Sequence, residues 1–251
     1  MFKRLIKGIL RRYGYNIVRD DSRTLPKDFG DGDIEIIRRV RSLTMTSPER
    51  IWSLIQATRY VVGANVPGAI VECGVWKGGS MMAVALALME LNAQSRDLYL
   101  FDTFEGMTRP GDRDVDLSGN AAGRTFEKRK LSQDSSDWAY ATMNEVRNAM
   151  AGTNYDAERI HLIKGKVEDT IPASAPDEIA LLRLDTDWYE STKHELVHLF
   201  PRLARGGILI VDDYGHWQGC KEAVDEYVRS HNVKIFLSRI DYAGRLAVKP
   251  Y

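Results

Sequence analysis

The feature that most constrains the fold is an alternation of short apolar runs with longer amphipathic segments, from residue 67 to the end of the chain. Continuous apolar runs such as Ile208-Leu209-Ile210-Val211 are typical of strands that are buried on both faces. Strands that alternate with helices predict an α/β fold with a mostly parallel, doubly wound sheet and helices on both faces. We predict seven strands, the last two as an antiparallel pair, at residues 69–73, 98–102, 160–164, 179–185, 207–212, 233–237 and 245–248. Helices are expected between them at residues 80–91, 138–151, 191–203 and 221–230.

Two further segments complete the predicted organisation. Residues 1–66 are expected to form an N-terminal helical extension, in which Ser47 followed by Pro48 is typical of a helix start. Residues 67–251 would form the main domain. The polar stretch at residues 108–136 is too long for an ordinary connection, and loops of this length usually act as lids, bind ligands or are disordered.

Charge and composition exclude several classes of protein. Lys and Arg together number 35, as do Asp and Glu, and this balance argues against a dedicated nucleic-acid-binding protein. Two cysteines cannot form a disulfide framework, so a reducing, cytoplasmic location is expected. The sequence has no apolar run of the roughly 20 residues that a membrane-spanning helix needs. Residues 2–12 are basic and amphipathic, which leaves three interpretations open: packing on the domain, packing on a second subunit, or peripheral contact with a membrane.

The first predicted strand leads into a glycine-containing turn. The turn runs from Glu72 through Gly74 and Gly78 to the start of a helix. Glycines let the backbone approach a ligand closely, and helix N-terminal amides favour a carboxylate. The spacing differs from that of a dinucleotide fingerprint and fits a ligand with an amino-acid end and a nucleoside, whose ammonium region Glu72 could anchor directly or through water. Asp102, at the end of the second strand, could accept both ribose hydroxyl hydrogens. Either acid could instead merely cap a helix.

Aspartates also end two later strands. Asp185 and Asp187 follow one strand, and Asp212 and Asp213 follow the next. Carboxylates that converge repel one another unless a cation lies between them, and ligand sets made only of oxygen favour Mg²⁺ over zinc. We therefore predict Asp185, Asp212 and Asp213 as metal ligands and Asp187 as the general base for a substrate hydroxyl. Helix capping is the alternative interpretation. His216 follows the Asp pair closely enough to reach the site.

At this level of detail the sequence resembles the macrocin O-methyltransferase (TylF) family. The resemblance rests on the motifs Val71-Glu72-Cys73-Gly74-Val75-Trp76-Lys77-Gly78-Gly79-Ser80, Phe101-Asp102-Thr103-Phe104-Glu105-Gly106, Leu184-Asp185-Thr186-Asp187-Trp188-Tyr189-Glu190-Ser191-Thr192 and Val211-Asp212-Asp213-Tyr214. It implies a Rossmann-like class I methyltransferase fold, S-adenosylmethionine as methyl donor and Mg²⁺ as metal. It also implies a homo-oligomer and a small-molecule acceptor that carries a sugar.

The same resemblance assigns roles to individual residues. Asp185, Asp212 and Asp213 match the metal ligands of the family, and Asp187 matches its proposed base. The segments that contact the donor match Thr46, Glu72, Gly74, Ser80 and Asp102. Lys166 departs from the family pattern, as do the segment at residues 108–136 and about the first forty residues. These departures leave the acceptor undefined.

Two other functions remain open from the sequence. Asp185-Thr186-Asp187 is also an Asp-x-Asp motif, which glycosyltransferases use to hold Mn²⁺ and a nucleotide sugar. That reading accounts for neither the glycine turn nor Asp212-Asp213. A binding module without catalytic activity is the second alternative, and the complete set of acidic residues argues against it.

Overall fold

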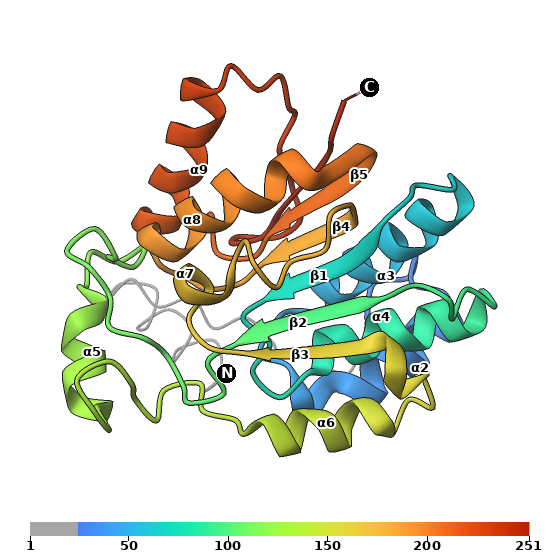
Figure 1. Cartoon of the computed structure of the whole chain (residues 1–251), viewed down its shortest axis with the longest axis horizontal. Coiled ribbons are helices and arrows are strands. Elements are labelled where there is room, and N and C mark those ends of the chain that lie inside the picture. The colour runs from blue at the N-terminus through green and yellow to red at the C-terminus, as the bar shows by residue number, and fades with distance from the viewer. Residues whose placement is uncertain (1–24, 251) are drawn as a thin grey trace, which may run out of the picture.

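The computed structural model describes residues 25–250, in which seven strands form one mixed sheet. The strand order is β3-β2-β1-β4-β5-β7-β6 (Figure 1). The first five strands of this order are parallel, whereas β7 runs antiparallel to β5 and β6 antiparallel to β7. The predicted α/β class with a mostly parallel sheet is therefore confirmed. The strands are β1 (Ala69–Cys73), β2 (Leu98–Asp102), β3 (Ile160–Lys164), β4 (Ile179–Leu184), β5 (Leu203–Val211), β6 (Ser238–Arg239) and β7 (Arg245–Val248).

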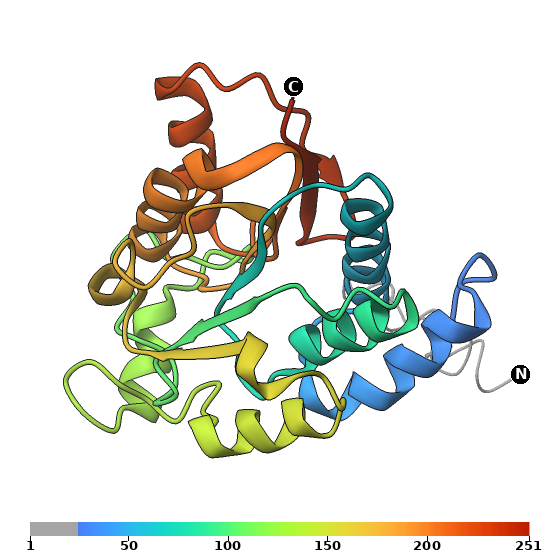
Figure 2. The ribbon, with the colours of Figure 1, turned by 45° about the vertical axis from the view of Figure 1, so that its right-hand side comes forward.

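Helices cover both faces of the sheet (Figures 1 and 2). One layer consists of α2 (Asp31–Val40), α3 (Pro48–Gly63), α4 (Gly79–Glu90) and α6 (Met143–Ala151). The opposite layer consists of α7 (Val167–Thr170), α8 (Tyr189–Leu199) and α9 (Gln218–Ser230). Short 3₁₀ turns at Arg41–Leu43, Ala157–Arg159 and Phe200–Arg202 connect some of these elements.

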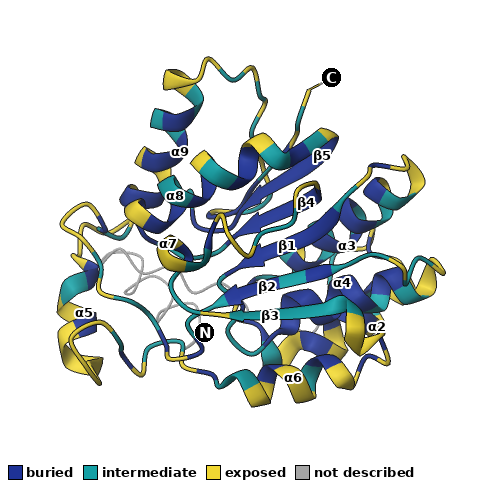
Figure 3. Ribbon diagram, viewed as in Figure 1, coloured by how far each residue is buried: buried dark blue, intermediate teal, exposed yellow. Residues whose placement is uncertain are grey.

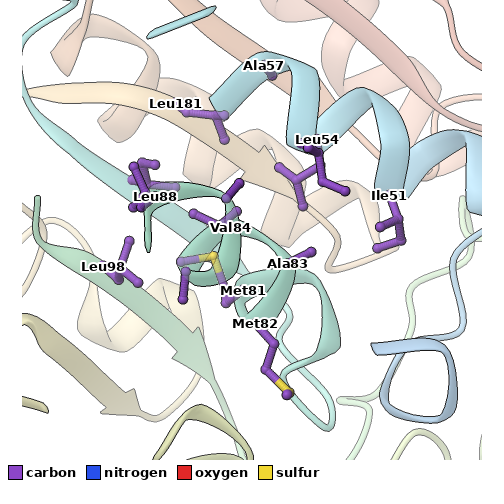
Figure 4. Close-up of a cluster of buried hydrophobic side chains, with 14 of the residues drawn as sticks. Ile51, Leu54, Ala57, Met81, Met82, Ala83, Val84, Leu88, Leu98 and Leu181 are labelled. Atoms are coloured by element: carbon purple, nitrogen blue, oxygen red, sulfur yellow. The ribbon is translucent and has the colours of Figure 1, made fainter. Parts of the chain in front are cut away.

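The two layers enclose two separate hydrophobic clusters. The first lies between the sheet and α2, α3, α4 and α6, with Leu54, Met81, Val84 and Leu88 among its members (Figure 4). The second packs the other face of the sheet against α8 and α9. Strands β1 and β4 are buried along their whole length, whereas β3 at the sheet edge is only half-buried (Figure 3). This pattern explains why the central strands have continuous apolar sequences.

Side-chain caps determine where several helices begin. The Ser47 hydroxyl accepts the amide of Arg50, and Pro48 occupies the first turn of α3, as predicted. Thr142 and Glu145 form a capping box, so α6 begins at Met143 instead of near residue 138. These caps account for the starts of α3 and α6.

The strand predicted at residues 233–237 is wrong. In the structure this segment is irregular, and the short strand β6 follows it at Ser238–Arg239. Val233, Ile235 and Leu237 pack, half-buried, against the second cluster, and this packing explains their alternation without a strand partner. β7 pairs with β6 at only two positions, Leu246 and Arg245.

The polar stretch at residues 108–136 is an ordered part of the domain. It contains a helix, α5 (Ala122–Arg129), and its first part is bound to the N-terminal ends of α8 and α9. The buried carboxylate of Asp114 accepts the amide hydrogens of Tyr189 (2.8 Å) and Gly111 (2.7 Å). The amide of Gln218 donates to the carbonyl of Val115 (2.9 Å). These bonds attach the first part of the stretch to the starts of α8 and α9, at the carboxyl end of the sheet.

The described part of residues 1–66 contains two α-helices. These are α2 and α3, which pack on α4 in the first cluster. The basic segment at residues 2–12 lies outside the described residues. Among the residues that the structure does describe, no helix has both the length and the hydropathy needed to cross a bilayer.

Candidate active site

The carboxyl ends of β1, β2, β4 and β5 surround a cavity of about 200 Å³. Its lining includes four of the predicted donor contacts, Thr46, Gly74, Ser80 and Asp102. It also includes all four of the later aspartates, Asp185, Asp187, Asp212 and Asp213. Parallel strands bring their carboxyl ends to one edge of the sheet, and this explains why residues distant in sequence converge here. A second, smaller cavity adjoins Asp102 and is also lined by Gly165, Lys166 and Glu168.

The turn after β1 packs closely against the backbone at the end of β4. Gly74 has a φ of +85°, and a Cβ atom at this position would lie 2.0 Å from the carbonyl oxygen of Asp185. No other residue fits here without a shift of the backbone. The Asp102 carboxylate fixes the turn from the next strand, because it accepts the amides of Val75 (2.7 Å) and Trp76 (3.0 Å). Burial raises the pKa of Asp102, and these amide hydrogen bonds act in the opposite direction.

Glu72 lies beneath the cavity and does not line it. Its side chain is fully buried and forms an ion pair with Arg183 of β4. Burial raises the pKa of Glu72 to about 7, although the Arg183 guanidinium opposes this rise. In this structure Glu72 therefore supports the floor of the site through Arg183.

Asp185, Asp212 and Asp213 form a compact group of carboxylates. Each offers one oxygen, and the three oxygens lie within 4.8 Å of one another. Asp213 Oδ2 is buried and has no hydrogen-bond partner. Burial, together with the charges of neighbouring carboxylates, raises the pKa of Asp185 and of Asp213 well above the ordinary range. An unpartnered oxygen among oxygen-only ligands fits a hard divalent cation such as Mg²⁺.

Asp187 lies in the same cavity in a left-handed backbone conformation, with a φ of +67°. The indole Nε1 of Trp217 donates a hydrogen bond of 2.6 Å to its Oδ1. Trp217 itself packs edge-on against Trp188, with ring centroids 5.0 Å apart. Burial and the nearby charge of Asp185 raise the pKa of Asp187 to about 8. Asp187 is thus held in one orientation and its proton affinity is raised.

Three residues that contact the aspartates of the site were not predicted from the sequence: Arg50, Arg183 and Trp217. Arg183 contacts Asp185 (2.8 Å) and Asp212 (2.7 Å), so it supplies part of the positive charge that the carboxylates need. Arg183 precedes Asp185 by two residues, and period-two spacing on a strand puts the two on one face. That spacing was a usable signal. Nothing in the sequence points to Arg50, which reaches the site from α3.

One histidine lines the cavity, and two others share a helix face away from it. His216 lines the cavity, and its ring lies between Trp217 (4.9 Å between centroids) and Tyr242 (6.0 Å). Burial lowers the pKa of His216, which favours its neutral form. His194 and His198 share one face of α8, where His194 Nε2 lies 3.0 Å from the carbonyl oxygen of Ile171. Neither of these two lines the cavity.

Comparisons with known proteins find one family model, several relatives and similar solved structures. The model of the macrocin O-methyltransferase (TylF) family matches residues 31–247. Demethyldecarbamoylnovobiocin O-methyltransferase of Streptomyces niveus is 36% identical over 203 residues, which are 80% of this chain and 73% of that protein. Mycinamicin III 3''-O-methyltransferase of Micromonospora griseorubida is 28% identical over 201 residues, 80% of this chain and 76% of that protein. The solved structure of the O-methyltransferase NovP superposes with a TM-score of 0.75 and 26% identity, over 88% of this chain and all of that one.

Proposed function

Since this chain belongs to the macrocin O-methyltransferase (TylF) family and is an O-methyltransferase, we propose that it methylates a hydroxyl of a sugar or of a sugar-bearing small molecule. The donor is S-adenosylmethionine. The proposal includes Mg²⁺ as the metal and a natural product or glycan as the source of the sugar. The observation that carries it is one cavity that holds the glycine turn, three clustered carboxylates and a separate, oriented carboxylate, Asp187.

The donor would bind along the glycine turn. Gly74 lets the turn lie against the backbone of Asp185, and the amides at the start of α4 would favour the carboxylate of S-adenosylmethionine. Ser80 and Thr46 offer hydroxyls to the same space. Asp102 lines both cavities, so its carboxylate is available to the ribose while it also holds the turn.

Asp185, Asp212 and Asp213 would hold the cation. The chemistry that such a cation would supply is a lower pKa for the acceptor hydroxyl and help in aligning that hydroxyl with the methyl group. Arg183 keeps the two ligands Asp185 and Asp212 in place from below the site. All three carboxylate residues line the cavity, so a cation between them would be accessible to an acceptor.

Asp187 would act as the general base. As the acceptor oxygen forms its bond to the methyl carbon, the carbon–sulfur bond of the donor breaks and the hydroxyl proton moves to Asp187. The raised pKa of Asp187 suits proton uptake near neutral pH. Because Trp217 occupies Oδ1, the second carboxylate oxygen is the one left for the acceptor.

The two other functions considered from the sequence are less well supported. A glycosyltransferase needs a nucleotide-sugar site around Asp185-Thr186-Asp187, and family membership argues for a methyl donor instead. A binding module without activity would not need an oriented carboxylate of raised pKa beside a cation site. A homo-oligomer and a cytoplasmic location stay predictions.

The test measures methyl transfer from labelled S-adenosylmethionine to a panel of glycosides, with added Mg²⁺, with EDTA, and with Mg²⁺ restored after EDTA. We expect transfer that EDTA abolishes and Mg²⁺ restores. Transfer that persists in EDTA would contradict the metal assignment alone. Binding of nucleotide sugars without any binding of S-adenosylmethionine, measured by calorimetry, would favour the glycosyltransferase.

A further inference from the structure

Arg50 joins the carboxylate group to a part of the molecule that the proposed chemistry does not use. Its guanidinium is buried, with a side-chain exposure of 10%, and lies between two carboxylates. Nη1 forms an ion pair with Oδ2 of Asp212, a proposed metal ligand. Nε lies 3.0 Å from Oδ2 of Asp241, in the turn between β6 and β7. The Arg50 guanidinium is therefore shared by Asp212, which lines the cavity, and Asp241, which does not.

Asp241 is held firmly on its own side. Its Oδ2 accepts a hydrogen bond of 2.7 Å from the hydroxyl of Ser47, and Ser47 also caps α3. Its Oδ1 accepts the backbone amides of Ala243 (2.9 Å) and Gly244 (2.7 Å). The stem of Arg50 packs on Gly244, where a Cβ atom would lie 2.9 Å from Arg50 Cδ. The start of α3 and the β6–β7 turn are thus joined through one carboxylate.

The charge of Arg50 bears directly on the proposed cation site. Both oxygens of Asp212 face arginines, Oδ1 facing Arg183 Nη2 at 2.7 Å and Oδ2 facing Arg50. A positive charge beside a metal ligand opposes the binding of a second cation in a poorly solvated site. Asp241 offsets that charge because it takes a share of the same guanidinium.

From this geometry we propose that Asp241 is a positioning residue that, through Arg50, sets how strongly Asp212 holds a divalent cation. The inference rests on the proposed metal site. It assigns a role to a residue that is not a metal ligand, does not line the cavity, and lies 29 residues after Asp212 in the sequence (241 − 212 = 29).

Two substitutions should change cation affinity in opposite directions. Asp241→Asn keeps a carbonyl oxygen for the amides of Ala243 and Gly244 but removes the charge that competes for Arg50. Its affinity for Mg²⁺ should fall roughly tenfold, the usual effect of losing a residue that supports a ligand. Arg50→Met keeps the aliphatic stem against Gly244 and removes the positive charge. Its affinity for Mg²⁺ should rise above that of the parent.

Asp33→Asn provides a matched control, because Asp33 of α2 pairs with another arginine of α3. Asp33 is buried and forms an ion pair with Arg59 of α3, and it also accepts Trp52 Nε1 and Gln56 Nε2, both at 3.0 Å. It lines neither of the two cavities described above. Loss of this pair should lower the melting temperature without a change in affinity for Mg²⁺.

The measurement is calorimetric titration of the full chain with Mg²⁺ alone, together with thermal melting and binding of S-adenosylmethionine for each variant. Opposite shifts for Asp241→Asn and Arg50→Met, with no shift for Asp33→Asn, support the proposal. Equal weakening in both site variants indicates a general structural role and overturns it, as does an unchanged Asp241→Asn. A parent that binds no divalent cation refutes the metal site and this inference together, whereas methyl transfer by that parent would keep the methyltransferase assignment.

Discussion

Glu195 offers a direct test of the electrostatics below the site. It lies in α8 with a fully buried side chain, and its Oε1 accepts the hydroxyl of Thr186 (2.9 Å), the residue between Asp185 and Asp187. Its other oxygen, Oε2, is buried without a hydrogen-bond partner. Burial raises the pKa of Glu195 well above the ordinary value, despite the opposing hydrogen bond from Thr186. The folded protein should therefore hold a proton here that the unfolded chain has released.

The sign and size of the effect follow from proton linkage. An unfolded glutamate has a pKa of about 4.3, so above that pH folding requires this carboxyl to take up one proton. The free energy of unfolding then falls as pH rises, by about 1.4 kcal/mol per pH unit from this group. This loss continues until the pH reaches the folded pKa.

Glu195→Gln should remove that dependence while keeping an acceptor for Thr186. Between pH 5 and pH 7 the free energy of unfolding of the parent should fall more steeply than that of the variant, by at most about 1.4 kcal/mol for each pH unit. Urea unfolding at pH 5, 6 and 7, in EDTA, measures the difference. Glu190→Gln is the control, since Glu190 is an exposed residue of the same helix. Parallel curves for the parent and Glu195→Gln would refute the assignment of a bound proton to Glu195.

Three further predictions concern the cavity itself. Asp187→Asn should bind S-adenosylmethionine like the parent but turn over roughly 10² to 10⁴ times more slowly, and turnover at the parental rate would rule out its role as base. Trp217→Phe removes the 2.6 Å hydrogen bond to Asp187 while keeping an aromatic ring, so kcat should fall with donor affinity unchanged; a loss of donor affinity instead would indicate a packing role. Gly74→Ala puts a Cβ atom 2.0 Å from the carbonyl of Asp185, so calorimetry should find weaker donor binding and melting a lower Tm; an unchanged variant would show that the turn can shift.

Much of the fold followed from local pattern. Continuous apolar runs identified β1, β2 and β4 because strands covered on both faces need no polar positions. The cap at Ser47 predicted the start of α3, since it depends on neighbouring residues alone. The strand prediction at residues 233–237 was wrong because the alternation there reflects contact with the second cluster and not pairing with another strand. Pairing depends on what lies beside a segment, which its own residues do not reveal.

The candidate site divides in the same way. The meeting of Asp185, Asp187, Asp212 and Asp213 was predictable from the sequence, because acids that end adjacent parallel strands share one edge of the sheet. In contrast, the position of Glu72 under the floor, paired with Arg183, depends on how the strands and helices pack in three dimensions. The same packing brings Arg50 to Asp212, 162 residues later in the chain (212 − 50), and brings Asp241 to Arg50. Strand periodicity fixes which residues emerge at an edge, but counter-ions arrive from whichever helix or turn packs there, and that packing depends on the whole chain.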